Sequence, residues 1–284
     1  MKKKMISIML ILVCSLSVFS VSKASNDTFY IYPEVQQAME ESSLVDPANE
    51  LYFEEVKQMF YENVHTNSED LNSMLAEAVS HINSVDFALE NKLSTLTQEQ
   101  EEMIENRNMY RDNETNYQSA LSNYALGVSL LRVKGCPYAA DSMEHAVVPE
   151  NKVGTSYTPT TLVYNQDSWA KKLCLIDELF WEIEGKFQSE ILATGKTSGS
   201  ISGGFSFTEA NSSLDAYLQL HNVDYVVTFT KKSNGYASVT RLKDLYNFEK
   251  NKYSGIMGAA VDYAYYMQQR GYIKPYYISI VYSY

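Results

Sequence analysis

The chain is poor in the residues that build metal and nucleophile sites. It has three cysteines and four histidines among 284 residues. Neither a Cys-x-x-Cys nor a His-x-x-x-His spacing occurs, and neither a nucleophile elbow nor a P-loop is present. The sequence therefore gives no support to a zinc site or a nucleotide-phosphate cradle, and we expect no metal and no cofactor.

Basic residues are also in deficit. The chain has 23 Lys and Arg against 35 Asp and Glu, a formal net charge of −12. Because nucleic acids and anionic membranes carry phosphate, an acidic surface repels both. Beyond the N-terminal segment, no apolar run reaches the roughly 18 residues that a membrane-spanning helix needs. We therefore expect no nucleic-acid partner and no stable membrane span.

The first residues read as an export signal. Met1–Met5 is a basic segment, Ile6–Val21 is an apolar run interrupted by serine, and Ser22-Lys23-Ala24 is a small-x-small cleavage sequence. This order is that of a cleaved secretory signal, and it resembles a bacterial Sec signal. We expect residues 1–24 to be removed and the mature chain to be secreted, with Ser25 as its first residue.

Two cysteines, Cys136 and Cys174, remain after such cleavage. An even count in an exported chain favours one disulfide, which would stabilise the fold by about 3–4 kcal/mol through loop closure. The alternative is a pair of buried free thiols, because spacing alone does not fix disulfide geometry.

Helical periodicity dominates the first half of the chain. Pro33–Ser42 predicts a short helix, Asp46-Pro47 a helix start, and Ser68 the start of a longer helix whose apolar stripe reaches Leu89. Thr97 predicts the start of a separate polar helix, and Thr115–Val133 an apolar one. Residues 25–134 are thus predicted to form antiparallel helices with short connections.

The middle of the chain, residues 135–204, is predicted to be a helical segment held by the disulfide and followed by a linker. Pro137–Val147 predicts a short helix, and one long helix is expected from Asp167 to Phe187. Gly195–Gly204 is rich in glycine and serine, which favours either a hinge or a flexible functional loop.

Nearly all of the strand signal lies in residues 205–284. Val223–Thr230 alternates apolar and polar residues, Asn234-Gly235 predicts a hairpin turn, and Pro275–Tyr284 predicts a last strand. Between them, a helix is expected from Ser254 to Arg270, ended by Gly271. The order is helix, strand, strand, helix, strand, and the fold class is α+β. We expect the helical N-terminal region to pack with a small C-terminal antiparallel or mixed sheet.

Two groups of acidic residues and histidines are candidate sites. Asp141 and His145 lie four residues apart on a predicted helix, where a carboxylate can orient an imidazole for acid–base work. The alternative is a surface pair. Asp215, His221 and Asp224 surround a helix-to-strand junction, where they predict either a binding site or helix capping.

The stretch Asp244-Leu245-Tyr246-Asn247-Phe248 follows a predicted strand and is expected in a loop, where functional residues are often carried. It resembles the Asp-x-Tyr-Asp core of the colicin-M-type bacteriocins, which implies hydrolysis of a lipid-linked cell-wall precursor. Asp244 and Tyr246 match that core. Asn247 stands where the second aspartate belongs, so the activity itself is not carried over.

From about residue 130 onward the chain also resembles C-terminal regions of exported and toxin-associated bacterial proteins of uncharacterised activity. The residues that carry this resemblance run from Lys134-Gly-Cys-Pro137 through Asp244–Phe248 to Met267-Gln-Gln. The resemblance implies export and interaction with a protein or cell-surface partner. The chain also has 23 tyrosines, which suit half-buried positions and binding surfaces.

The leading functional hypothesis is thus a secreted interaction module. The alternative is a toxin-like hydrolase that acts on a cell-envelope substrate, with Asp244, Tyr246 and either His221 or His145 as catalytic residues.

Overall fold

The computed structural model describes residues 29–63, 68–105, 117–250 and 255–284, and within this part five strands form one mixed sheet in the order β1-β5-β4-β3-β2. β1 runs parallel to β5, and every other neighbouring pair is antiparallel. The strands are β1 (Leu162–Asn165), β2 (Ser198–Ser206), β3 (Asn222–Lys232), β4 (Gly235–Tyr246) and β5 (Tyr276–Ser283). The last strand in the chain therefore lies inside the sheet, between β1 and β4.

Helices surround this sheet, and residues from Ile31 to Tyr284 form one compact unit. The predicted α+β class is correct. The α-helices are α2 (Pro33–Val45), α3 (Ala48–Asn63), α4 (Ser68–Glu105), α5 (Tyr117–Val133), α6 (Pro137–His145), α7 (Ser168–Cys174), α8 (Asp177–Lys186), α9 (Leu214–Gln219) and α10 (Gly255–Gln269). A 3₁₀ turn, η1 (Glu150–Lys152), and a π-helical turn, η2 (Phe187–Leu192), complete the helical segments.

Local capping explains where several of these helices begin. The side chain of Asp46 accepts a hydrogen bond from the backbone N–H of Ala48 at 3.0 Å, and α2 has Pro33 in its first turn. Asp167 caps α7 in the same way, through the N–H of Ala170 at 2.7 Å. These starts agree with the sequence prediction.

The predicted helix boundaries fail in two places. A separate helix was expected from Thr97, but α4 is continuous from Ser68 to Glu105. Its sequence has no glycine or proline that would interrupt the backbone hydrogen bonds. The helix expected from Asp167 to Phe187 is instead divided at Leu175–Ile176 into α7 and α8. The predicted start at Ser254 lies outside the described residues.

The hairpin between β3 and β4 is confirmed. Lys232 pairs with Gly235, so the two turn residues are Ser233 and Asn234, one position earlier than the predicted Asn234-Gly235. Gly235 begins β4 with a φ of 153°, which side chains rarely adopt. The helix α10 then connects β4 to β5, and it is followed by Gly271 at a φ of 70°.

The predicted glycine- and serine-rich linker is wrong, because most of it is the edge strand β2. All nine residues of β2 pair with β3, from Ser198 opposite Thr230 to Ser206 opposite Asn222. Gly203 is required by packing: a Cβ there would lie 2.6 Å from the hydroxyl of Tyr225, its partner across the strands. Because Gly203 has no side chain, the side chain of Tyr225 can lie across β2 at this position. The glycine and serine content of the segment does not by itself reveal this role.

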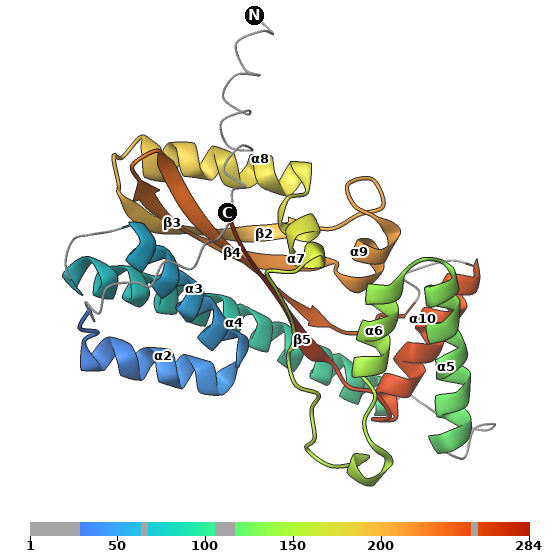
Figure 1. Ribbon diagram of the computed structural model, residues 1–284. Coiled ribbons are helices and arrows are strands. Elements are labelled where there is room, and N and C mark those ends of the chain that lie inside the picture. Colours follow the sequence, from blue (N-terminus) through green and yellow to red (C-terminus); the bar gives the residue numbers. More distant parts are fainter. Residues whose placement is uncertain (1–28, 64–67, 106–116, 251–254) are drawn as a thin grey trace, which may run out of the picture. The chain divides into compact units, whose positions relative to one another are not determined.

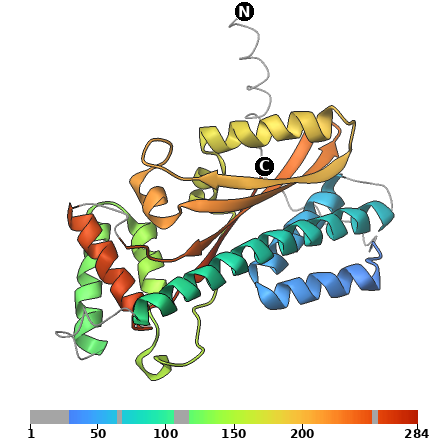
Figure 2. The same cartoon turned by 180° about the vertical axis from the view of Figure 1, so that it is seen from behind.

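Helices cover both faces of the sheet (Figures 1 and 2). α3 and α4 contact β3 and β4 on one face, while α7 contacts β4 and β5, and α8 contacts β2, on the other. α5, α6 and α10 lie together beyond one end of the sheet.

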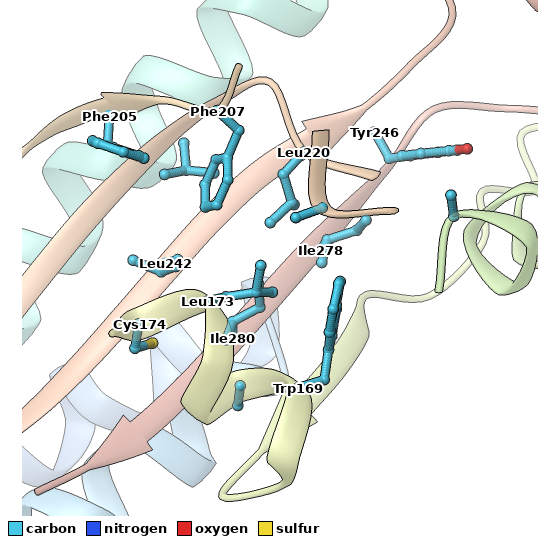
Figure 3. Close-up of a cluster of buried hydrophobic side chains, with 14 of the residues drawn as sticks. Trp169, Leu173, Cys174, Phe205, Phe207, Leu220, Leu242, Tyr246, Ile278 and Ile280 are labelled. Carbon is cyan, nitrogen blue, oxygen red and sulfur yellow. The ribbon is translucent and has the colours of Figure 1, made fainter. Parts of the chain in front are cut away.

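The two faces differ in chemistry. The face toward α7 and α8 is apolar, and its core includes Trp169, Leu173, Leu242 and Ile280 (Figure 3). The face toward α3 and α4 carries polar and charged side chains that are nonetheless buried: Thr228, Thr230, Arg241, Lys243 and Ser279. Three tyrosines of the sheet, Tyr225, Tyr246 and Tyr276, are buried. The other sheet tyrosines are half-buried: Tyr164, Tyr236, Tyr277 and Tyr282. None of the tyrosines in the five described strands is fully exposed.

Candidate functional site

The predicted catalytic residues Asp244 and Tyr246 lie on β4, which extends to Tyr246, and not in the loop that was expected. Both are buried. The carboxylate of Asp244 accepts a hydrogen bond from the backbone N–H of His221 at 3.1 Å. This contact ties β4 to the beginning of β3, so the structure brings Asp244 to the backbone of His221.

Tyr246 belongs to an aromatic cluster at the end of the sheet. Its ring lies 5.3 Å from that of Tyr276 and 5.2 Å from that of Phe248, centroid to centroid. The neighbouring hydroxyls are used in the core: Tyr124 donates to Met143 O at 2.9 Å, and Tyr276 donates to Ser142 O at 2.8 Å. Burial raises the pKa of both Tyr124 and Tyr276 well above the usual value. Tyr124 and Tyr276 are therefore neutral phenols that pack in the core around Tyr246.

Asp141 and His145 both lie on α6 but have different partners. Asp141 forms an ion pair with Arg132 at 2.8 Å, and Nε2 of His145 lies 2.7 Å from the carbonyl oxygen of Thr160. The His145 ring also packs edge-on against Tyr276 at 4.7 Å. Asp141 therefore takes part in a surface ion pair. The contact of His145 with Thr160 links α6 to the segment before β1.

Of Asp215, His221 and Asp224, Asp215 has partners in α6. The buried Asp215 accepts hydrogen bonds from the backbone N–H groups of Ala139 at 2.8 Å and Tyr138 at 3.3 Å, and so caps α6 from α9. Burial raises the pKa of Asp215, although these two bonds oppose the shift. Asp224 lies in β3 opposite Lys243. For Asp215, capping is the role that the geometry supplies.

The predicted disulfide is absent, because Cys136 and Cys174 are both free and buried. Cys136 is the N-cap of α6 and lies beside the start of α7, near Ser168 and Trp169. Cys174 is the last residue of α7, roughly 9 Å farther along the helix axis at 1.5 Å per residue. It points into the core beside Leu242 (Figure 3). The two thiols thus lie at opposite ends of α7, and burial raises the pKa of each.

A pocket of about 450 Å³ opens where α6, α7 and α9 begin. Its lining combines aromatic, aliphatic and basic side chains: Lys134, Cys136, Tyr138, Trp169, Lys172 and Leu214. Apolar atoms provide most of its surface, which suits a ligand with an apolar anchor.

A second pocket, of about 440 Å³, adjoins the first along α7. Both pockets are lined by Lys172 and Ser213, and a 3.3 Å hydrogen bond from Lys172 Nζ to Ser213 Oγ lies at their common border. We call the two together the α7–α9 groove. Its second half continues past Ile176 to Asp177 and Glu178 at the start of α8.

The aromatic wall of the groove is held rigidly. Tyr138 and Trp169 stack with ring centroids 4.0 Å apart and planes 4° from parallel. Trp169 Nε1 donates to Gln219 Oε1 at 2.7 Å, and Gln219 Nε2 donates in turn to Ser142 Oγ at 2.8 Å. The ammonium group of Lys172 lies 5.1 Å from the Trp169 ring, as a cation–π contact requires. The wall is therefore preorganised, and one positive charge is fixed on its rim.

The sequence did not single out this groove. Trp169 lies in the predicted first turn of a helix, and Lys134, Lys172 and Leu214 belong to three separate segments of the sequence. Lys134 and Leu214 are 80 positions apart in the sequence, and only the packing of α9 against α6 brings them together. Nothing in local periodicity records that contact.

Among the described residues, no group of three or more His, Cys, Asp or Glu side chains gathers as a set of metal ligands. None of the helices in the described ranges combines the length and apolarity that crossing a bilayer requires. Comparisons with known proteins add no relative: no family model, no curated protein and no solved structure matches this chain.

Proposed function

We propose that this protein is exported and acts outside the cytoplasm as a binding module, which holds a segment of a partner polypeptide in the α7–α9 groove. The observation that carries the proposal is the pair of adjoining pockets with a rigid aromatic wall, about 450 and 440 Å³ in volume. An elongated groove that is mainly apolar in its first pocket and mainly polar in its second suits a peptide better than a compact metabolite.

The charge of the groove selects the class of partner. The chain as a whole has a net charge of −12, yet Lys134 and Lys172 line the first pocket. The acidic side chain in that pocket, Asp215, already accepts two backbone hydrogen bonds. The second pocket is lined by Asp177 and Glu178, so the excess of positive charge belongs to the first pocket alone. An acidic residue beside an apolar anchor therefore complements the first pocket, since opposite charge guides encounter and fixes register.

Export rests on the N-terminal residues 1–24, with their basic, apolar and small-x-small order. These residues lie outside the described part of the chain. The toxin-like hydrolase stays a prediction that the geometry does not favour, because the buried Asp244 is bound to the backbone N–H of His221.

The binding proposal can be tested with the protein's own fluorescence. The chain has two tryptophans, Trp169 in the groove and Trp181 on α8, and Trp181 is 55% exposed. A Trp181→Phe variant leaves Trp169 as the single reporter. The probe is a short synthetic peptide that carries aspartates and glutamates around one leucine, and its reference is the same peptide with asparagine and glutamine.

We expect the acidic peptide to change the Trp169 emission with saturation. Lys172→Glu should weaken binding by about tenfold, which corresponds to roughly 1.4 kcal/mol. Lys171→Glu is the matched control, because Lys171 is exposed on the same helix but lines neither pocket. Equal affinity for the two peptides, or equal loss in the two lysine variants, would contradict the proposal.

A further inference from the structure

β2 forms one edge of the sheet, and its register shows which of its backbone groups face outward. Lys231 N donates to Thr197 O at 2.7 Å, and Phe207 N donates to His221 O at 2.7 Å. Thr197 and Phe207 therefore bond inward, and hydrogen-bonded pairs in an antiparallel ladder recur at every second residue. The backbone groups of Ser200, Ser202 and Gly204 consequently point away from β3.

Charged side chains from the two flanking helices cover part of this edge. Glu77 on α4 accepts a hydrogen bond from Ser200 N at 3.3 Å, and Lys186 on α8 donates to Ser202 O at 2.8 Å. In the described part of the chain, no protein group reaches the N–H of Ser202 or either backbone group of Gly204. Ser202 and Gly204 are also exposed. The middle of the edge is thus ready for pairing with another strand.

Ser200 is buried, but little side-chain bulk obstructs the edge from Ser202 to Gly204. Gly203 and Gly204 have no side chains, and Ser202 is small. β2 runs between α4 and α8 on the outside of the sheet (Figures 1 and 2). The approach to Ser202–Gly204 is therefore limited mainly by Glu77 and Lys186, whose flexible side chains can turn aside.

We propose that the edge from Ser200 to Gly204 binds an extended segment of a partner polypeptide as an added antiparallel strand. This site is separate from the α7–α9 groove. Backbone hydrogen bonds supply affinity in such an addition, and side chains at alternating positions supply specificity. The partner's carbonyl and N–H groups replace Glu77 and Lys186 on Ser200 and Ser202, so both side chains lose their contact with the backbone of β2. Lys186 keeps its ion pair with Glu182 at 3.4 Å.

The two displaced side chains, Glu77 and Lys186, define the chemistry of the partner. Ser200 faces the α4 side, where Glu77 lies, while Gly203 faces the α8 side, where Lys186 lies. Successive residues of a strand point to opposite faces. A basic residue opposite Ser200 meets Glu77, and an acidic residue opposite Gly203 meets Lys186. In an antiparallel segment the acidic residue comes first, and the basic residue follows three positions later.

The test uses the mature chain and labelled synthetic peptides with an acidic-x-x-basic core of threonine and valine. Binding is measured by fluorescence anisotropy, and amide hydrogen exchange reports the N–H groups of Ser202 and Gly204. We expect saturable binding, slowed exchange at both amides, and at least about fivefold weaker binding of the peptide with the two charges interchanged. Unchanged exchange at both amides, or association of the protein with itself in place of peptide binding, would overturn the proposal.

Two variants at one position separate the backbone contact from folding. Gly204→Pro removes the outward N–H, and proline is tolerated where an edge N–H faces solvent. Gly204→Ala keeps that N–H, and its Cβ would meet Val223 O at an ordinary 3.7 Å. The proline variant should lose peptide binding, and the alanine variant should keep it.

A further variant remains informative if the proline variant does not fold. Glu77→Gln keeps an acceptor for Ser200 N and removes only the charge. It should abolish the preference for the basic residue, and a preference that survives in this variant would contradict the assigned register.

Discussion

At the scale of single residues, the most unusual feature is a group of buried charges between the sheet and its helical cover. Arg241 Nη2 and Lys243 Nζ both lie 2.8 Å from Oδ2 of Asp46, and Lys243 also pairs with Asp86 on α4. Asp46, Arg241 and Lys243 are each at most 2% exposed. Lys243 Nζ also lies 4.6 Å from the Tyr277 ring centroid. Removing any partner would leave charge buried and uncompensated.

We expect Asp46→Asn to lower the free energy of unfolding by about 3–5 kcal/mol. Asparagine keeps an oxygen that can accept from Ala48 N and cap α3, so the loss reports the missing charge. Urea unfolding at neutral pH measures it. Asp141→Asn is the control, because Asp141 pairs with Arg132 at the exposed surface and should cost roughly 0–1 kcal/mol.

The same group makes stability depend on pH. Burial opposes ionisation of Asp46, but Arg241 and Lys243 outweigh it and lower the pKa of Asp46 below its usual 3.8. A carboxylate whose pKa is lower in the folded state stabilises the protein above its unfolded pKa. This contribution is lost as the pH falls through the folded pKa. The stability difference between wild type and Asp46→Asn should therefore shrink below about pH 4, and a constant difference down to pH 2 would refute this origin.

At the scale of secondary structure elements, β2 shows how one glycine allows a strand to form. Tyr225 lies across Gly203, its hydroxyl donates to Glu182 at 2.7 Å, and Lys186 lies 4.9 Å from the ring centroid. The side chain of Tyr225 thus connects α8 to the edge strand β2. Burial together with the Glu182 carboxylate raises the pKa of Tyr225, so its phenol stays protonated in this contact.

We expect Gly203→Ala to destabilise the protein by about 1–3 kcal/mol, because the added methyl group would collide with Tyr225. Gly204→Ala is the neighbouring control, with only ordinary contacts for its Cβ. Thermal unfolding of the two variants measures the difference. Equal midpoints would mean that Tyr225 does not cross the strand at Gly203.

At the scale of the whole molecule, residues from Ile31 to Tyr284 form one compact unit without a covalent cross-link among the described cysteines. The sheet joins segments distant in sequence, since β5 pairs with β1 on one side and β4 on the other. The C-terminal residue takes part as well: Tyr284 and Ser238 exchange backbone hydrogen bonds of 2.7 and 2.9 Å. Stability thus depends on packing across the whole unit.

Intact mass measurement of the protein recovered from the culture medium tests export and thiol state together. We expect a chain that begins at Ser25 and takes up two alkyl groups when alkylated in denaturant without reductant. Samples reduced beforehand provide the control and should give the same mass. A chain that retains residues 1–24, or one that is alkylated only after reduction, would contradict the export proposal or the free thiols, respectively.

Local chemistry explains which predictions succeeded. The α+β class, the helix starts at Pro33, Asp46 and Asp167, and the hairpin between β3 and β4 all follow from the sequence. Each depends on residues within a few positions, through a fixed φ, a side-chain cap or a tolerated positive φ.

Features that depend on residues far apart in the sequence follow from the packed fold. Asp46 and Arg241 are 195 positions apart, and neither the buried charges nor the α7–α9 groove leaves a periodic trace. Residues 198–206 form the strand β2 because they pair with β3. Gly203 permits this pairing because its missing side chain leaves space for Tyr225. The thiols stayed apart because α7 separates Cys136 from Cys174. Burial and partner choice are properties of the packed chain, and local sequence does not contain them.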